Sequence, residues 1–285
     1  MVLYYIKHCN LYGKPPRDLI DNNVRSDYGK LRYLVYTNHK LNGNFEILRN
    51  LAGGESVSTA SIVQDFSAFN LVNEENFKSL LFFQGLVSFE HSNSLQCKLR
   101  IPNETIKRID MDYLKDSLEY ENVFQLNTER LGEKLADFAL NGTLDVFEYI
   151  AENIKNNTGI RDYIHNETAV KSMYLTYLSM TPYMVIRSEA ELNKGFADIL
   201  LKPLHPLVEV VGIVELKYFP RREGKAPTDK EIEKAVAEAS EQLEKYQDDI
   251  EVTRWTDKGR KLVKVVIVFH GWELVKIVNT AFLSN

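Results

Sequence analysis

Residues 195–218 read GFADILLKPLHPLVEVVGIVELKY, and this stretch decides the fold. Both of its halves are predicted to be strands because Val, Ile and Leu dominate them. Each half also carries charge among its apolar residues: Asp198 in the first, and Glu215 with Lys217 in the second. Because strand side chains alternate between the two faces of a sheet, Glu215 and Lys217 project to the same side. The sequence therefore predicts two strands that present two carboxylates and one ammonium group.

The segments on either side of this stretch alternate between helical and strand patterns. Helices are indicated by apolar residues that recur every three or four positions, and strands by short apolar runs. The long helix after the second strand begins with a capping box formed by Thr228 and Glu231. Its residues Gln242 and Tyr246 are four positions apart and lie on one helix face. The predicted order is helix, three strands, helix and two strands, over residues 167–180, 183–188, 196–201, 210–218, 228–250, 263–269 and 274–278.

The N-terminal part of the chain has the pattern of a small helical module. The third predicted helix carries Glu74 and Glu75 against Lys78, which is too acidic for an element that faces phosphates, so we favour a protein-packing role. We divide the chain into a helical, winged-helix-like N-terminal region, residues 1–125, and a second domain, residues 126–285. The winged-helix order of three helices and a hairpin is predicted over residues 45–51, 62–69, 73–81, 86–89 and 95–101.

The composition limits the class of protein. The chain has 285 residues with 35 Lys and Arg against 40 Asp and Glu, so its net charge of −5 gives no general attraction to nucleic acid or to an anionic membrane. Any site for a polyanion must be local. Charged and polar side chains interrupt the most apolar stretch, residues 262–278, which excludes a membrane-spanning helix there. The N-terminus lacks the pattern of a signal peptide, so we expect a cytoplasmic protein.

The charges on the two strands have the chemistry that phosphodiester hydrolysis needs. This reaction builds up charge on the phosphate and consumes hydroxide made from water, and a divalent metal can serve both needs. Magnesium prefers one or two carboxylates together with waters and a substrate phosphate. Asp198 and Glu215 are therefore candidate ligands for Mg or Mn. The ammonium group of Lys217 would then orient the attacking water or stabilise the transition state.

The order of elements and the spacing of the charged residues resemble the PD-(D/E)XK nuclease superfamily. The resemblance runs from about residue 128 to the C-terminus and is closest to RecB-like members, whose second helix carries a QxxxY pattern. It implies an α/β (α+β) fold with a restriction-endonuclease-like α-β-β-β-α-β core. It also implies an Mg-dependent phosphodiesterase, a deoxyribonuclease, with RNA as an alternative substrate. The residues that carry the resemblance are Glu167, Asp198, Glu215, Leu216, Lys217, Gln242 and Tyr246.

The resemblance also implies roles for residues outside the central three. The carbonyl of Leu216 would be a further metal ligand, and Glu167 would be the helix carboxylate near the metal, a role for which Glu189 and Glu191 are alternatives. The helix residues of the QxxxY pattern, Gln242 and Tyr246, would contact the nucleic-acid backbone or brace the water on the metal. Local phosphate contacts are expected from the loop after the second strand, namely from Arg221, Arg222 and Lys225.

Parts of the sequence are also similar to bacterial AAA-ATPase-like proteins. The strand at residues 195–201 resembles the nuclease-like domain at the C-terminus of those proteins, and residues 27–31 and 101–103 resemble the region between their ATPase and nuclease parts. The chain contains no G-x-x-x-x-G-K-[ST] loop, so we expect no ATP site in it. An ATPase on another chain is therefore a candidate partner.

Two other interpretations remain open. The nuclease fold could bind nucleic acid, or an ATPase partner, without cutting. Taken singly, the candidate residues also have structural explanations, with Glu215 and Lys217 as an edge-strand ion pair and Asp198 as the cap of a turn. Gln242 could be part of a polar helix face beside a core tyrosine, Tyr246. The occurrence of these residues together, among Val, Ile and Leu on two strands, favours the nuclease site.

Overall fold

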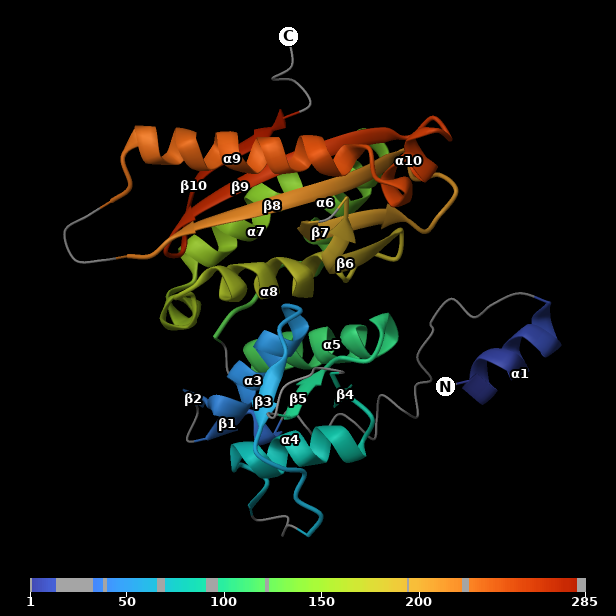
Figure 1. Ribbon diagram of the computed structural model, residues 1–285, viewed down its shortest axis with the longest axis vertical. Helices are drawn as coiled ribbons and strands as arrows, with labels where there is room; N and C mark the ends of the chain where they lie inside the picture. Colours follow the sequence, from blue (N-terminus) through green and yellow to red (C-terminus); the bar gives the residue numbers. More distant parts are fainter. Residues whose placement is uncertain are drawn as a thin grey trace. The chain divides into compact units, whose positions relative to one another are not determined.

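The computed structural model describes residues 2–13, 33–37, 40–65, 70–90, 97–120, 123–193, 195–221 and 226–280. The chain divides into two compact units, residues 1–117 and 118–285, and each is described by itself. The second unit is a mixed α/β structure built around a five-stranded sheet, as predicted (Figure 1). None of the helices in the described ranges is both long enough and apolar enough to cross a membrane.

The sheet of the second unit consists of β6 (Met184–Leu192), β7 (Gly195–Pro203), β8 (Val210–Phe219), β9 (Lys261–His270) and β10 (Glu273–Asn279). Its strand order is β10-β9-β8-β7-β6. Neighbouring strands are antiparallel except for β8 and β9, which are parallel. A parallel pair needs a long connection, and here α9 (Asp229–Gln247) provides it. The predicted capping box of Thr228 and Glu231 begins this helix, as expected.

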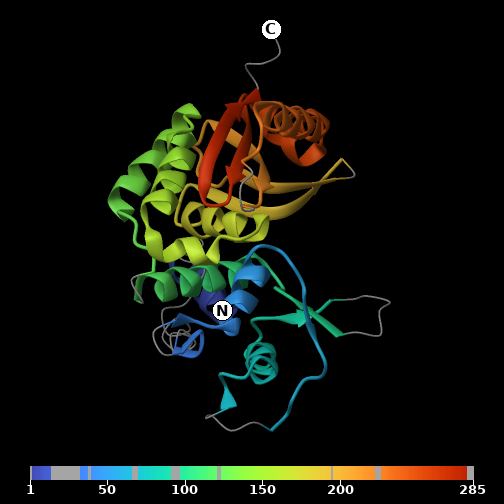
Figure 2. The same ribbon diagram turned by 90° about the vertical axis from the view of Figure 1, so that its left-hand side faces the viewer.

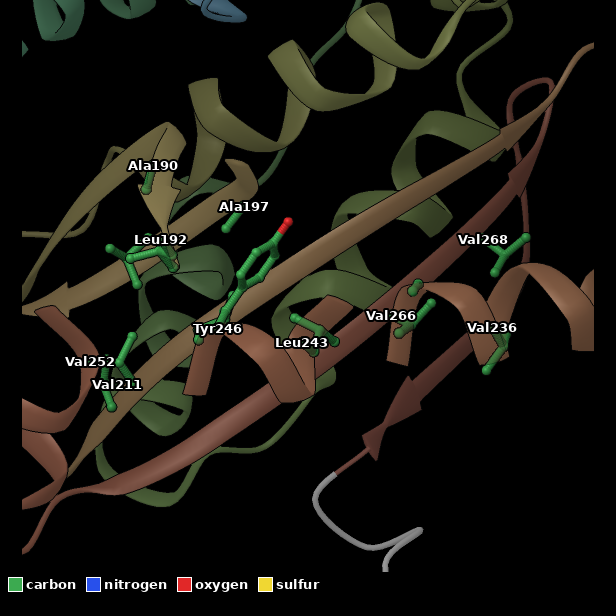
Figure 3. Packing of buried hydrophobic residues seen from close by; sticks show 13 residues of the cluster. Ala190, Leu192, Ala197, Val211, Val236, Leu243, Tyr246, Val252, Val266 and Val268 are labelled. Atoms are coloured by element: carbon green, nitrogen blue, oxygen red, sulfur yellow. The ribbon is translucent and has the colours of Figure 1, made fainter. Parts of the chain in front are cut away.

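Helices cover both faces of this sheet (Figure 2). On one face α9 and the following α10 (Ile250–Thr256) enclose an apolar cluster, in which Leu243 and Val236 pack toward the strands (Figure 3). The other face carries α6 (Thr128–Asn141) and α7 (Asp145–Asn156), and Phe138 of α6 lies against Gly212 of β8. A 3-10 helix, η3 (Thr158–Tyr163), leads into α8 (Glu167–Leu178), which contacts β6 and β8.

The strand β7 is paired with β6 from end to end except at Asp198, but with β8 along only part of its length. The β6–β7 ladder extends to the pair Leu192–Gly195 beside the turn. The β7–β8 ladder ends at the pair Ile199–Val214, although β8 continues to Phe219 alongside β9. Backbone groups beyond this point must find partners other than the neighbouring strand. The charged residues of both strands lie at this separation.

The first unit contains a three-stranded antiparallel sheet of order β3-β5-β4. The predicted hairpin is confirmed, because Ser88 pairs with Arg100 and Phe89 with Leu99. The assignment as a winged helix stays a prediction. The elements are α1 (Val2–Tyr12), β1 (Tyr36–Thr37), β2 (Lys40–Leu41), α3 (Gly43–Ala52), β3 (Val57–Thr59), α4 (Glu74–Phe83), β4 (Ser88–Phe89), β5 (Cys97–Arg100) and α5 (Glu104–Tyr120), the last of which extends past residue 117.

The helix predicted over residues 62–69 is wrong where the structure describes it. Residues 60–65 are irregular, and the rest of that prediction lies outside the described residues. The side chains of α4 give the physical reason. The N–H of Val63 donates to Ser79 Oγ at 2.9 Å, and another amide of this segment donates to Glu75. These tertiary hydrogen bonds use backbone donors that a helix would have needed.

Replacing Gly212 by alanine is expected to destabilise the second unit. A Cβ at this position would lie 2.9 Å from Cζ of Phe138 and 3.1 Å from Cδ1 of Leu201, so packed side chains would have to move. We expect a loss of about 1–3 kcal/mol in the free energy of unfolding. Both tryptophans of the chain, Trp255 and Trp272, lie in the second unit, so their fluorescence during urea denaturation reports on this unit.

A matched glycine in the same unit serves as the control. Gly132 lies within α6, and an added Cβ would meet nothing within 4 Å. Gly132→Ala is therefore expected to stabilise the unit by about 1 kcal/mol, because alanine is the better helix former. Equal effects of the two substitutions would contradict the packing of α6 against β8.

Candidate active site

Asp198 lies on β7 at the point where β7 separates from β8. Its Oδ2 accepts the backbone N–H of Leu216 at 2.8 Å, beyond the last backbone pair of the two strands. The residue is 9% exposed. Because a main-chain donor of β8 binds one carboxylate oxygen, the side chain is held in one orientation across the gap. Asp198 and the Glu215 segment are thus brought together, as the sequence predicts.

Glu215 is 3% exposed and lies beside both charged neighbours. Its Oε2 is 3.5 Å from Nζ of Lys217, whereas its Oε1 is buried and has no hydrogen-bond partner among the described residues. Burial, followed by the charge of Asp198, raises the pKa of Glu215 to about 8, against the opposing effect of Lys217. A buried carboxylate oxygen without a partner, next to a second carboxylate, is a favourable place for a cation.

Lys217 and Gln242 meet across the interface between β8 and α9. The ammonium group of Lys217 donates to Oε1 of Gln242 at 3.2 Å, and about a quarter of the lysine side chain is exposed. The ammonium group therefore lies at the edge of the site, where it reaches both the buried Glu215 and solvent. Gln242 uses one of its three donors and Glu215 lies 3.5 Å away, so the donors not engaged by these two residues are left for a water molecule or a phosphate oxygen.

Tyr246 is buried against the start of β7, and its predicted contact with nucleic acid stays a prediction. The residue is 5% exposed, and its hydroxyl donates to the carbonyl of Phe196 at 3.3 Å. Its ring extends from α9 toward Ala197 on β7 (Figure 3). The ring fits there because position 195 is glycine, where a Cβ would lie 2.6 Å from the hydroxyl. Tyr246 thus holds the first residues of β7, just before Asp198.

Glu167 is the first residue of α8 and approaches the same site from a third element. The helix starts there because the side chain of Asn166 accepts the N–H of Ala169 at 2.8 Å. Glu167 is exposed, yet surrounding protein removes part of the water around its carboxylate. This desolvation, followed by the charge of Asp198, raises the pKa of Glu167. Glu167 therefore lies within electrostatic reach of the metal candidates, as the resemblance implies.

Lys171 is a member of the site that the sequence analysis missed. It follows Glu167 by one helical turn and is 5% exposed. Its ammonium group contacts the carboxylate of Glu189 and lies 3.4 Å from Oδ1 of Asp198. Burial alone would lower the pKa of Lys171, but Asp198 and Glu189 together raise it, so the group is a cation. The spacing of Glu167 and Lys171 on one helix face is the signal that could have indicated this residue.

The remaining acidic candidate and the basic loop are only partly placed. Glu191 is exposed and stands opposite Phe196 in the ladder, whereas Glu189 contacts Lys171. Of the two alternatives to Glu167, Glu189 is the one within the site. Arg222 and Lys225 lie outside the described residues.

Arg221 belongs to a basic and aromatic cluster at one end of β8. Its guanidinium lies 4.0 Å from the ring centre of Trp272 and contacts the carboxylate of Glu273. Arg161 lies 5.4 Å from the same ring centre, and Lys155 is 3.7 Å from Glu273. The residues Arg161, Arg221, Trp272, Glu273 and Lys155 are called the Arg–Trp cluster below. It carries three cations against one carboxylate.

The oxygen ligands at the site fit a small divalent cation that takes only some of its ligands from the protein. Asp198 and Glu215 supply two carboxylates, and the Leu216 carbonyl directly follows Glu215 in the chain. Across the described residues, no group of three or more His, Cys, Asp and Glu side chains converges closely enough to hold a metal ion by itself. Magnesium is commonly held by one or two carboxylates, with waters and substrate phosphate as the other ligands. The residues present therefore fit such an ion.

Removing the charge of Glu215 is expected to stabilise the metal-free protein at neutral and alkaline pH. Its pKa of about 8 in the folded state exceeds the ordinary value of 4.5, so the folded state binds the proton more tightly. The stability of the wild type should therefore fall as the pH rises from 4.5 to 8. Glu215→Gln removes this dependence, and its advantage should grow over that interval to a few kcal/mol.

Urea denaturation in the presence of chelator, at several pH values, measures this difference. Glu233→Gln, on the exposed face of α9, controls for the loss of one negative charge. If Glu215→Gln and wild type had the same stability at pH 8, the carboxylate would not be destabilised by its surroundings.

Comparison with known proteins identifies the part of the chain that carries this site. A comparison with curated proteins found no match. Residues 165–279 match the family model described as the PD-(D/E)XK nuclease superfamily. The matched range extends from just before α8 to the end of β10, so it contains Glu167, Lys171, Asp198, Glu215 and Lys217. Over residues 165–279, the part of the chain that carries the candidate site, the protein is therefore similar to the PD-(D/E)XK nuclease superfamily.

Proposed function

We propose that the protein is a Mg- or Mn-dependent nuclease that hydrolyses phosphodiester bonds of DNA. Members of the superfamily are mostly phosphodiesterases, and the fold generally uses divalent metals. The observation that carries the proposal is the meeting of Asp198 and Glu215 beside Lys217, with one oxygen of Glu215 buried and unpartnered. Most buried carboxylate oxygens in proteins have a hydrogen-bond partner, so this oxygen supports a place for a bound cation.

The roles of the residues follow from their positions. Asp198 and Glu215 would hold the cation, with the carbonyl of Leu216 as a further ligand. The cation supplies charge that offsets the negative charge developing on the phosphate, and it makes water easier to deprotonate. Asp198 is oriented by the N–H of Leu216, so this ligand does not have to be ordered when the cation binds.

Lys217 would act on the attacking water or on the scissile phosphate. Gln242 accepts one of its protons at 3.2 Å and so fixes the direction of the ammonium group. The remaining donors can hold a water molecule in line with the phosphorus atom or neutralise a phosphate oxygen. Glu167, on α8, interacts electrostatically with Asp198 and Lys217. It would bind the cation through a water molecule or take a proton from the attacking water.

The Arg–Trp cluster is a candidate contact for the DNA backbone. Arg221 follows Lys217 by four residues, so its Cα lies at most about 14 Å away. A chain with a net charge of −5 needs such a local concentration of cations to bind a polyanion. Arg222 and Lys225, which follow Arg221 closely in the sequence, are proposed as further phosphate contacts. An ATPase partner on another chain remains a separate proposal.

Substitution of the central residues is expected to abolish cleavage. Asp198→Asn removes a metal ligand and Lys217→Met removes the cation beside the phosphate, so each should lower the rate at least about 100-fold. Nicking of plasmid DNA and release of acid-soluble nucleotides from single-stranded DNA, with Mg or Mn, measure this rate. A chelator should have the same effect on the wild type. Asp229→Asn and Lys245→Met, on the exposed surface of α9, are the matched controls.

The possible results separate the interpretations. Cleavage that survives both Asp198→Asn and Lys217→Met would refute the assignment of the site. A folded wild type that binds DNA but cleaves neither DNA nor RNA would instead indicate a module that does not cut, or a nuclease that needs its ATPase partner.

Neutralising the Arg–Trp cluster is expected to weaken DNA binding without abolishing it. Arg161→Gln and Arg221→Gln should each reduce the slope of log affinity against log salt concentration by about 1, the value for one lost phosphate contact. Fluorescence anisotropy of labelled DNA, at several salt concentrations and with chelator present, measures the slope. Arg130→Gln, an exposed arginine on α6, is the control. An unchanged slope for both cluster variants would restrict the cluster to a structural role.

A further inference from the structure

The number of cations at the site can be inferred from its charge and its occupied ligands. Enzymes that cleave phosphodiesters with metals use either one ion or two ions about 3.5–4 Å apart. A second ion needs free carboxylate oxygens and enough negative charge nearby. The described residues around Asp198 supply information on both points.

Each oxygen of Asp198 already has one protein partner, and the partner of Oδ1 is a cation. Oδ2 accepts the N–H of Leu216 at 2.8 Å. Oδ1 lies 3.4 Å from the ammonium group of Lys171, which also contacts Glu189. Lys171 is 5% exposed, and both carboxylates that contact its ammonium group hold it within the protein. The side of the site that α8 covers thus already contains a fixed positive charge.

The charge of the site matches one divalent ion. Its ionisable groups are the carboxylates of Glu167, Glu189, Asp198 and Glu215 and the ammonium groups of Lys171 and Lys217. Four carboxylates against two ammonium groups give a net charge of −2 when all are ionised, which one divalent cation neutralises. Without Lys171 the charge would be −3, and the carboxylates of Glu189 and Asp198 would lose the ammonium group that they share.

The backbone at Glu189 has a strained conformation, and the side chain of this residue forms the ion pair with Lys171. Glu189 has a φ of 48° in the middle of β6, a conformation that residues other than glycine seldom adopt. Such strain persists where surrounding contacts hold the residue in place. Here the contact is the ion pair with Lys171.

We propose that the ammonium group of Lys171 takes the place of a second metal ion, so that this active site binds a single divalent cation. The inference rests on the proposed metal-dependent function and adds the stoichiometry of the metal. Lys171 is then a positioning residue: it neutralises Glu189 and one oxygen of Asp198, and directs the incoming cation toward Glu215.

Counting bound Mn²⁺ tests this inference without any measurement of cleavage. Electron paramagnetic resonance of free Mn²⁺ in titrations of the full chain gives both the number of bound ions and their affinity. We expect one ion in the wild type and a marked loss of affinity in Asp198→Asn. Lys171→Met should bind a second ion, and its first ion should bind at least about tenfold more tightly because a neighbouring positive charge is gone.

The chain contains a well-matched control lysine. Lys264 is also 5% exposed and also pairs with a glutamate, Glu244, at 2.6 Å, but it belongs to a different cluster between β9 and α9. Lys264→Met therefore removes an equally buried cation from the same unit and should still bind one ion. Lys171→Arg, which keeps the charge, should also bind one.

Each outcome decides the question. Two ions in the wild type would overturn the inference, and this count needs no variant that must fold. A single ion of unchanged affinity in folded Lys171→Met would overturn it as well, because Lys171 would then be structural only. Absence of any bound Mn²⁺ in the wild type would overturn the proposed metal-dependent function itself, whereas one bound ion without cleavage would leave the stoichiometry intact.

Discussion

The hydrogen bond from the Leu216 N–H to Asp198 is the interaction on which the site depends. It forms where β7 leaves β8, so it satisfies a backbone donor that the ladder no longer pairs. The same bond sets the position of a carboxylate beside Glu215. A sheet that remained paired to the end of β8 would have satisfied its backbone but would have had no room for converging side chains. The active site thus results from a controlled break in the sheet.

The elements around this break hold the residues of β7 in place. On one side, the ring of Tyr246 holds the start of β7 through the Phe196 carbonyl. On the other side, α8 places a buried cation against Asp198. The cost of the arrangement is concentrated at Glu215, whose burial next to another carboxylate opposes ionisation. Stability is therefore lowered at a residue of the candidate site, which is typical of sites that await a charged ligand.

The sequence predicted the elements that have strong local signals and missed what depends on tertiary contacts. Apolar runs located the five strands of the second unit, and the capping box located the start of α9. The positions of Asp198, Glu215 and Lys217 on two predicted strands were sufficient to predict that these side chains lie close together. Lys171 was missed because a lysine on a helix ordinarily reaches solvent, and its burial depends on Glu189. Residues 60–65 were misread because their helical pattern gives no sign of bonds to α4.

The parallel pairing of β8 with β9 bears on how the site is assembled during folding. The hairpin of β6 and β7 joins residues close in sequence, and its ladder already contains the segments that carry Glu189 and Asp198. In contrast, Val210 pairs with Lys261, about fifty residues later, and this contact requires the closure of a long loop through α9. Such non-local pairing is slow compared with hairpin formation. Of the two candidate metal ligands, Asp198 therefore belongs to a local folding unit, whereas Glu215 lies on the strand that makes the most distant contact of the sheet.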